Sequence, residues 1–247
     1  MFFSEIKNFI QEKNYPEFQL KAVFFDMDGV LLDSMENHAK AWVRTMNDLS
    51  IPFTIEEAYM NEGRVGHDTI NSAYMRAFGR VATVEEQESI YEIKTQHLET
   101  LGPILAMPRS TELLNKIKQQ ELAIYLVTGS GQPTLINSLD DYFPDIFVKD
   151  RMVTAFDVKR GKPSPEPYLK ALNKSGLKPW EVVVIENAPL GVESSVAAGL
   201  FTIAVNTGPL DSEVLSANGA NVVLIRGMQE LFEKWDDFYA CSVLVTH

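Results

Sequence analysis

Short apolar runs separated by stretches with a helical pattern constrain the fold of this chain more than any other feature. The runs are Lys21–Asp26, Leu122–Val127, Val182–Ile185, Phe201–Val205 and Val222–Ile225. Apolar runs of this length without polar alternation predict strands that are buried on both faces. The helical patterns between them predict crossovers that cover both faces of a parallel sheet. We therefore expect an α/β protein with a parallel-sheet core.

One long segment lacks the strand pattern. From about Glu36 to Ala106 the chain shows helical patterns, for example Asn37–Leu49 and Glu85–Leu101, and no convincing strand. Gly102-Pro103 and Met107-Pro108 supply helix breakers where this segment ends. The expected division is a core of residues 17–34 and 107–240, an inserted helical cap of residues 35–106 and an N-terminal extension helix in residues 1–16.

The charge of the chain narrows the range of partners. The formal net charge is −12, from 22 basic and 34 acidic residues, whereas nucleic acids and anionic membrane surfaces attract basic proteins. The single cysteine, Cys241, cannot form an internal disulfide. No apolar run is long enough to cross a membrane, and charged residues begin too early for a secretory signal. We expect a cytoplasmic monomer that binds neither nucleic acid nor a membrane.

Polar residues follow several of the predicted strands. Asp26-Met27-Asp28-Gly29 ends the first, Thr128-Gly129-Ser130 the second and Glu186-Asn187 a later one, while the run Ile146–Val153 leads to Lys162-Pro163. Open parallel sheets bind ligands beyond the carboxyl ends of their strands, so these groups should share one edge. Carboxylate and amide oxygens suit Mg²⁺. A carboxylate nucleophile beside a metal and a lysine suits phosphoryl transfer.

Each of these motifs also has an ordinary structural interpretation. Asp-x-Asp-Gly is a common turn sequence, and Lys162-Pro163 by itself is a surface turn. Thr128-Gly129-Ser130 alone is a loop or a helix start, and Glu186-Asn187 alone is a helix cap. Their order, their spacing and their shared position at strand ends favour a functional site.

Together the motifs resemble those of the haloacid dehalogenase superfamily. Residues 23–30 are similar to its motif I, residues 126–129 to motif II, residues 161–163 to motif III and residues 184–187 to motif IV. The resemblance extends from residue 21 to about residue 235. The resemblance is greatest to the β-phosphoglucomutase-like branch of phosphatases and mutases. Asp33-Ser34, His38 and Trp42 also resemble the residues of that branch. It implies a Rossmann-like core domain with an inserted small helical cap.

The resemblance implies a role for each catalytic position. Asp26 is the nucleophile that forms an aspartyl-phosphate, and Asp28 protonates the leaving oxygen and then activates the second acceptor. True dehalogenases have no acidic residue at the position that matches Asp28. The acid at this position therefore favours phosphoryl transfer over dehalogenation. Thr128 binds the transferring phosphoryl group, and Lys162 neutralises its charge together with that of the nucleophile.

The remaining contacts of the phosphoryl group and of the metal follow from the same resemblance. Backbone N–H groups near Thr128 assist in binding the phosphoryl group, which places Gly129 and Ser130 in the substrate site. Mg²⁺ is held by the Asp26 carboxylate, the backbone carbonyl of Asp28 and the side chains of Glu186 and Asn187.

Motif IV departs from the usual pattern at Asn187, where the branch has an aspartate. An amide brings no charge, so Mg²⁺ should bind less tightly unless another acid compensates. Glu62, in a loop that resembles the specificity loop of the cap, is our candidate. We hypothesise that it reaches the metal, or the substrate beside it, when the cap closes. The alternative is a solvated loop acid.

Three more cap residues are candidates for the substrate site. Arg64 and Lys94 could hold a distal phosphate or the rest of the substrate, or they are ordinary surface cations. His38 could position Asp28 or take part in proton transfer, or it is a structural histidine on a helix.

Three functions fit these residues. The first is a phosphohydrolase acting on a small phosphorylated metabolite, such as a sugar phosphate or inorganic pyrophosphate. The second is a sugar-phosphate mutase of the β-phosphoglucomutase kind, and the third is a non-catalytic phosphate sensor. In the mutases, an arginine stands at the position two residues after Arg64, and this chain has no arginine there. The acidic side chain of Glu62 also reduces the space for a sugar. Both observations favour hydrolysis.

Overall fold

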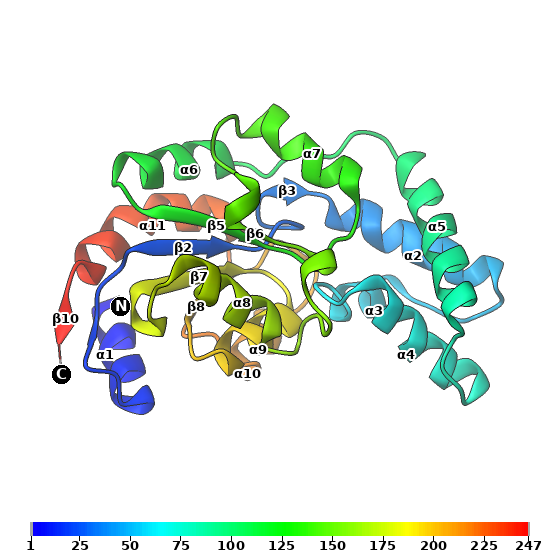
Figure 1. The fold of residues 1–247 in the computed structure, drawn as a ribbon, viewed down its shortest axis with the longest axis horizontal. Coiled ribbons are helices and arrows are strands. Elements are labelled where there is room, and N and C mark those ends of the chain that lie inside the picture. Colours follow the sequence, from blue (N-terminus) through cyan, green and yellow to red (C-terminus); the bar gives the residue numbers. More distant parts are fainter. Residues whose placement is uncertain (1, 247) are drawn as a thin grey trace.

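A parallel sheet forms the centre of the computed structural model, which describes residues 2–246 apart from the side chains of residues 133 and 134. Six strands form it, in the spatial order β6 (Met152–Val153), β5 (Ala123–Val127), β2 (Ala22–Phe25), β7 (Val182–Glu186), β8 (Phe201–Val205) and β9 (Val222–Leu224) (Figure 1). Phe25 at the end of β2 pairs with Leu126 and Ile185 on its two neighbours, so these three strands end together. The predicted α/β class with a Rossmann-like parallel sheet is confirmed.

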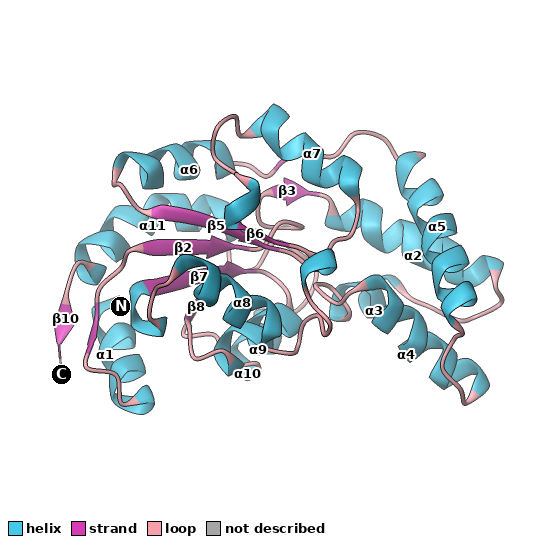
Figure 2. Cartoon of the chain, in the orientation of Figure 1, coloured by secondary structure: helices cyan, strands magenta, loops and turns pink. Residues whose placement is uncertain are grey.

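Helices cover both faces of the sheet (Figure 2). They are α1 (Phe2–Lys13), α6 (Ser110–Gln119), α7 (Pro133–Tyr142) and α11 (Gly227–Ser242) on one face, and α8 (Glu166–Ser175), α9 (Pro189–Ala197) and α10 (Ser212–Ala217) on the other. Along β2, Val23 and Phe25 pack into the first apolar cluster, whereas Ala22 and Phe24 pack into the second. Both sets are fully buried, which explains why the strand sequence is apolar at every position.

Four helices form the cap beyond the carboxyl ends of the strands (Figure 1). They are α2 (Met35–Asp48), α3 (Ile55–Met60), α4 (Gly66–Phe78) and α5 (Val84–Glu99), and they share an apolar cluster of their own. Local sequence sets their ends. Thr83 and Glu86 form a reciprocal capping box at the start of α5, and Gly79 ends α4 with a φ of 68°.

Two sequence-based expectations about strands are wrong. The segment 36–106 contains a short strand, because β4 (Leu105–Ala106) pairs with β3 (Leu32–Asp33) where the cap joins the core. Two residues are too few to show a period-2 pattern. Of the run Ile146–Val153, only the two residues of β6 pair with β5, since the charged residues 149–151 form a 3₁₀ turn instead.

The N-terminal helix packs directly on the core. Phe2, Ile6, Phe9 and Ile10 of α1 are buried, and the Phe2 ring lies 5.3 Å from that of Phe238 on α11. The short strand β1 (Glu17–Phe18) then pairs with β10 (Val245–Thr246) in an antiparallel arrangement. The two ends of the described chain are therefore joined to each other and to the same apolar cluster.

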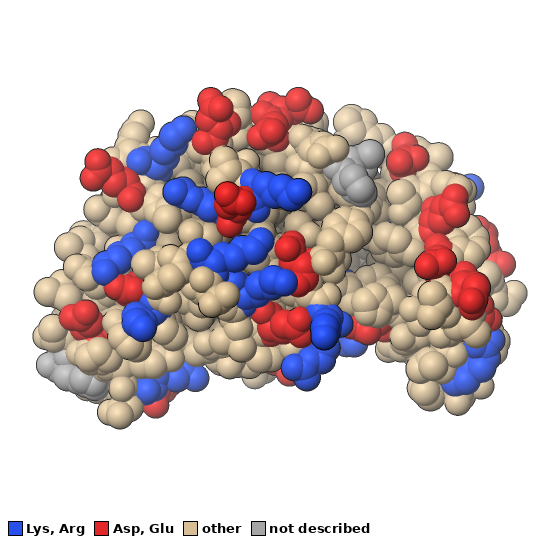
Figure 3. Space-filling view, viewed as in Figure 1, with Lys and Arg blue, Asp and Glu red and all other residues tan. Residues whose placement is uncertain are grey.

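The charges are distributed unevenly over the surface. Lys and Arg side chains gather over the core in the view of Figure 3, while acidic side chains predominate along the outer side of the cap. The helices of the described residues include none with the length and hydrophobicity needed to cross a membrane.

Candidate active site

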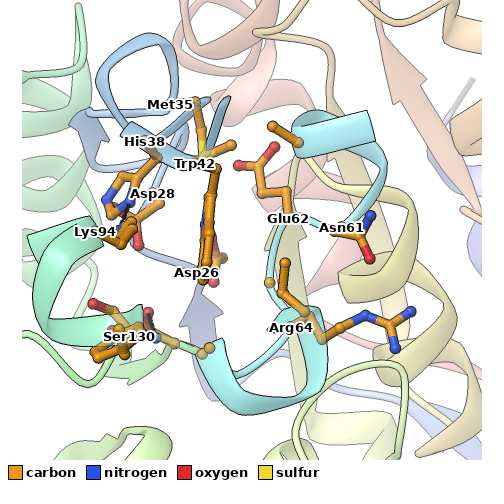
Figure 4. A pocket seen from close by; sticks show the side chains of 17 residues that line it. Asp26, Asp28, Met35, His38, Trp42, Asn61, Glu62, Arg64, Lys94 and Ser130 are labelled. Atoms are coloured by element: carbon orange, nitrogen blue, oxygen red, sulfur yellow. Dashed lines mark hydrogen bonds and ion pairs between the residues drawn. The ribbon is translucent and has the colours of Figure 1, made fainter. Parts of the chain in front are cut away.

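A small cavity, partly open to solvent, lies between the cap and the carboxyl ends of the strands (Figure 4). Its volume is about 60 Å³. Nine of the residues predicted for the site line it: Asp26, Asp28, Thr128, Gly129 and Ser130 from the core and His38, Glu62, Arg64 and Lys94 from the cap. The other three, Lys162, Glu186 and Asn187, are buried. Lys162 contacts Asp26, Asn187 contacts Glu62, and Glu186 contacts Lys162. The structure therefore brings together motifs that are widely separated in the sequence.

Lys162 connects the acids behind the cavity. Its Nζ donates hydrogen bonds to Asp26 Oδ1 at 2.5 Å, to Glu186 Oε1 at 2.5 Å and to the Val127 carbonyl at 3.1 Å. An ammonium group has three protons, so all of its donors are used. Lys162 thus holds one oxygen of the Asp26 carboxylate in place and leaves the other free.

The protonation of Asp26 reflects its buried position. Burial raises the pKa of Asp26 to about 8, against the lowering effect of Lys162, and the carboxylates of Glu186 and Asp28 add to the rise. Burial disfavours charge on Lys162 as well, but Asp26 and Glu186 outweigh it and raise its pKa. The ammonium therefore keeps its proton. A further cation beside Asp26 would favour the ionised, nucleophilic carboxylate.

Asp28 is contacted by two residues of the segment that enters the cap. Ser34 Oγ donates to Asp28 Oδ1 at 2.5 Å, and His38 Nε2 lies 3.2 Å from the same oxygen. Burial alone would raise the pKa of Asp28, but His38 and then Ser34 and Lys94 hold it below its ordinary value. Asp28 is therefore a carboxylate in this conformation, the form that accepts a proton.

His38 is in turn contacted by a buried lysine. Lys94 Nζ lies 2.7 Å from His38 Nδ1. It also lies 5.5 Å from the centre of the Trp42 ring and 5.8 Å from that of Tyr91, both suitable for cation–π contacts. Burial lowers the pKa of Lys94 to about 7, opposed by Asp28. A charged Lys94 can only donate, so His38 then carries its own proton on Nε2, facing Asp28.

Glu62 extends from the loop between α3 and α4 to the core. Its Oε1 accepts a hydrogen bond from Asn187 Nδ2 at 2.7 Å, and the side chain is buried. Burial raises the pKa of Glu62 well above its ordinary value, although the hydrogen bond from Asn187 acts to lower it. In this conformation Glu62 is not a solvated loop acid. Gly29 lies against Glu62 and Asn187, and a larger residue would not fit there. A Cβ at position 29 would lie 2.1 Å from Asn187 Nδ2.

The oxygen atoms near Asp26 fit Mg²⁺. Within residues 2–246, no three His, Cys, Asp or Glu side chains form a ready-made metal cluster. Mg²⁺, however, is commonly held by one or two carboxylates together with water and substrate phosphate. Asn187 Oδ1 is buried and has no hydrogen-bond partner among the described residues, which is unusual unless a ligand completes it. Asp26, the Asp28 carbonyl and Asn187, with Glu62 alongside, therefore make a plausible chemical donor set.

Other site residues differ in how they face the cavity. Thr128 Oγ1 accepts from the Ser130 N–H at 3.0 Å, which shapes the loop at the end of β5. The Arg64 guanidinium is directed away from Asp26 in Figure 4, and its Nε is buried without a partner. Glu186 directs its oxygens to Lys162, to Tyr168 and to backbone N–H groups.

Sequence reasoning gave no role to two residues that contact the site. Ser34 stands immediately before α2, where serine often caps a helix, but its hydroxyl bonds Asp28 instead. Tyr168 OH donates to Glu186 Oε1 at 2.6 Å. An aromatic residue within a helical pattern is usually a core residue, so no local signal distinguished Tyr168.

The fold and the site define an α/β enzyme with a buried acid–lysine centre at the carboxyl edge of a parallel sheet. A family model of haloacid dehalogenase-like hydrolases matches residues 20–199. Hexitol phosphatase A from Escherichia coli is 33% identical over 204 residues, covering 79% of this chain and 87% of that protein. The beta-phosphoglucomutase of Bacillus subtilis is 25% identical over 232 residues, covering 89% of this chain and 97% of the other.

One solved structure is similar over nearly its whole length. It is a provisionally assigned beta-phosphoglucomutase from Bacteroides vulgatus, with 48% identity, a TM-score of 0.94 and 98% of both chains covered. The present chain belongs to the haloacid dehalogenase-like hydrolases. Its resemblance to the phosphatase and mutase branch is confirmed, and the chain is an enzyme.

Proposed function

We propose that this enzyme is a Mg²⁺-dependent phosphohydrolase that acts on a small phosphorylated metabolite through an aspartyl-phosphate on Asp26. The observation that carries the proposal is the small cavity of about 60 Å³ that Asp26 and Asp28 share with Glu62 of the cap. About 10–15 Å³ of such volume is enough to hold one water molecule, so this cavity suits a compact group. Inorganic pyrophosphate and small sugar phosphates are the substrates we favour.

The first half of the reaction uses Asp26 as nucleophile and Asp28 as acid. An oxygen of Asp26 attacks phosphorus, the bond from phosphorus to the leaving oxygen breaks, and Asp28 in its protonated form gives that oxygen a proton. Since the pKa of Asp28 is held below its ordinary value, Asp28 must first take up this proton from solvent when the substrate phosphate binds. Thr128 and the nearby backbone N–H groups stabilise the charge on the transferring group. When bound, Mg²⁺ would offset the negative charge of Asp26 and of the phosphoryl group.

The second half returns the enzyme to its starting state. Asp28, now a carboxylate, takes a proton from water while the water oxygen bonds to phosphorus. The bond between Asp26 and phosphorus breaks, and inorganic phosphate is released. The pKa of Asp28, held below its ordinary value, suits it to this step.

A sugar-phosphate mutase is the second candidate. The similarity to two proteins described as beta-phosphoglucomutases favours it. A mutase must exclude water and allow a sugar to turn within the closed site. The acidic Glu62 occupies part of that space, and the Arg64 guanidinium points away from Asp26. These two observations support hydrolysis over transfer to a sugar.

The test is a phosphate-release screen in the presence of Mg²⁺. It includes pyrophosphate, hexose 6-phosphates and β-glucose 1-phosphate, with coupled detection of glucose 6-phosphate. We expect release from at least one compact substrate and its loss in Asp26→Asn. Isomerisation faster than phosphate release would replace the proposal with the mutase, and release from none of the substrates would overturn it.

A further inference from the structure

A second, larger cavity adjoins the catalytic one, and we call it the outer groove. Its volume is about 340 Å³, against about 60 Å³ for the catalytic cavity. Gly66 at the start of α4 and Tyr91 of α5 line both cavities. These two residues therefore form a wall that the cavities share.

The Tyr91 ring fills the space that Gly66 leaves in this wall. A Cβ at Gly66 would lie 2.2 Å from Tyr91 Cε2, so the ring lies directly on the backbone at the start of α4. The ring centre is also 5.8 Å from Lys94 Nζ and 6.4 Å from the centre of the Trp42 ring. Lys94 and Trp42 both line the catalytic cavity. Close neighbours therefore hold the ring in place between the two cavities.

The wall extends from the cap to the core. The helix that carries Tyr91 contacts the loop after β5, where Gln132 Nε2 donates to Thr95 Oγ1 at 3.4 Å. Gly131 of the same loop lines the outer groove together with Tyr91. Burial raises the pKa of Tyr91 to about 12, although the backbone of Gly131 and the side chain of Gln132 act to lower it. The phenol is therefore neutral at ordinary pH, and Tyr91 adds no charge to the wall.

The outer groove has apolar surface on both sides. Val65 and Val84 contribute it from the cap, and Ala155 and Phe156 from the core. Val84 is 63% exposed and Phe156 is 73% exposed, so this surface is open to a ligand. Ligand cavities commonly have volumes of about 300–1,000 Å³ and apolar linings. An aromatic ring fits the groove in both size and polarity.

We propose that Tyr91 is a specificity-determining residue, whose ring separates the catalytic cavity from the outer groove and so excludes phosphate esters with an aromatic leaving group. The inference rests on the proposed phosphohydrolase function and names the residue that limits its substrate class. Without the ring, the two cavities join beside Gly66. The phosphoryl group of an aryl phosphate then reaches Asp26 while its aromatic ring occupies the groove. The bond from phosphorus to the aryl oxygen breaks, and Asp28 protonates that oxygen as for a compact substrate.

The first experiment measures kcat/KM for para-nitrophenyl phosphate and for the compact substrate that wild type hydrolyses fastest. We expect Tyr91→Ala to raise the ratio of the first to the second at least about tenfold, since a poor fit in a pocket costs about 10- to 200-fold. Tyr91→Leu, which keeps an apolar side chain, should raise the ratio as well if Tyr91→Ala does not fold. Tyr91→Phe keeps the ring and should stay within about twofold of wild type.

Two further variants distinguish the wall from a loosened cap. Tyr74→Ala removes a ring from the apolar cluster against which Tyr91 packs, but Tyr74 does not line the cavity, so the ratio should not change. Phe156→Ala should have no effect on the ratio in the wild-type background, where the groove is separate. Added to Tyr91→Ala, it should remove at least about threefold of the gain, because the aromatic leaving group loses a wall of the groove.

A binding measurement tests the same wall without turnover. Calorimetric titrations compare phenylphosphonate with methylphosphonate, and we expect Tyr91→Ala to raise the relative affinity for phenylphosphonate at least about tenfold. An unchanged preference in Tyr91→Ala and Tyr91→Leu, or an equal rise in Tyr74→Ala, would overturn the inference. If wild type releases phosphate from no substrate, the proposed function fails, while the phosphonate titrations still test the role of Tyr91.

Discussion

Asp28 is held by polar side chains that reach it from a single short segment. Ser34 and His38 both contact its Oδ1, and Lys94 contacts His38 from the neighbouring cap helix. The acid therefore does not depend on the sheet alone for its position. Because α2 begins right after Ser34, movement of the cap would be transmitted directly to the environment of Asp28.

Ser34→Ala tests this dependence. The substitution removes a donor 2.5 Å from Asp28 Oδ1, so the pKa of Asp28 should rise. When hydrolysis of the aspartyl-phosphate limits kcat, Asp28 must be ionised to take a proton from water, and activity is lost as pH falls through its pKa. We therefore expect the acidic limb of the kcat–pH profile to move to higher pH. Ser110→Ala, which removes a buried serine hydroxyl at the start of α6, should leave the profile in place. A shift to lower pH would contradict this account.

Glu62→Gln tests the role of the cap acid. Glutamine can still accept the hydrogen bond from Asn187, but it cannot ionise, so it removes the negative charge that Glu62 would carry beside a bound cation. We expect the Mg²⁺ concentration for half-maximal activity to rise about tenfold. The exposed Glu56→Gln, in α3 of the same cap, should not change it. An unchanged Mg²⁺ dependence in Glu62→Gln would show that Glu62 does not act through the metal.

At the scale of elements, glycines allow the cap loop to pack against the core. A Cβ at Gly129 would lie 2.1 Å from the Gly63 carbonyl oxygen, and one at Gly161 would lie 2.7 Å from Val65 Cγ1. Gly63 itself lies against Lys162, because a Cβ there would meet Cδ at 2.9 Å. Backbone therefore meets backbone at Gly129 and Gly63, with no space for a side chain at position 129.

Gly129→Ala should disturb this contact. The added methyl group forces the cap loop away from the core, and a displacement of about 1 Å can cost about 100-fold in rate. We expect kcat/KM to fall by that order while the melting temperature changes little. Gly131→Ala is the control, since its Cβ would lie 3.5 Å from Ala155, an ordinary contact. Equal activity of the two variants would argue against close packing of the loop during catalysis.

At the scale of the whole molecule, the chain ends stabilise the core rather than the site. Phe9 of α1 is buried, with ring centres 6.2 Å from Phe18 on β1 and 5.4 Å from Phe201 on β8. The β1–β10 pairing adds a second connection between the ends. This group of contacts lies at the opposite end of the strands from the cap (Figure 1).

Phe9→Ala should therefore reduce stability without altering the site. Removing a buried phenylalanine side chain costs about 3–5 kcal/mol, so urea denaturation should show a large drop in the free energy of unfolding. Phe3→Ala changes an exposed residue of the same helix and should cost less than about 0.5 kcal/mol. A Phe9→Ala protein as stable as wild type would mean that α1 contributes little to the core.

Local pattern was sufficient for most of the sheet and for placing several candidate residues at one edge of it. The strands buried on both faces are apolar at consecutive positions, so β2, β7 and β8 could be predicted closely. Their parallel arrangement places the ends at one edge, which is why Asp26, Thr128 and Glu186 could be assigned to one site in advance. The β3–β4 pair was missed because two residues carry no periodic signal, and β6 is shorter than the run Ile146–Val153 that contains it.

Contacts between distant segments required the tertiary structure. Glu62 meets Asn187 across 125 positions of sequence, and Tyr168 meets Glu186 between two separate elements. Such contacts depend on how the cap and the helices pack, and no local periodicity encodes them. The sequence by itself determined the parallel sheet and the acids at its edge, because burial follows from local composition and the parallel direction follows from the alternation of strands with helices. Only the tertiary structure decided which acid Lys162 shares with Asp26 and which oxygen remains without a partner, because hydrogen bonds are assigned in three dimensions.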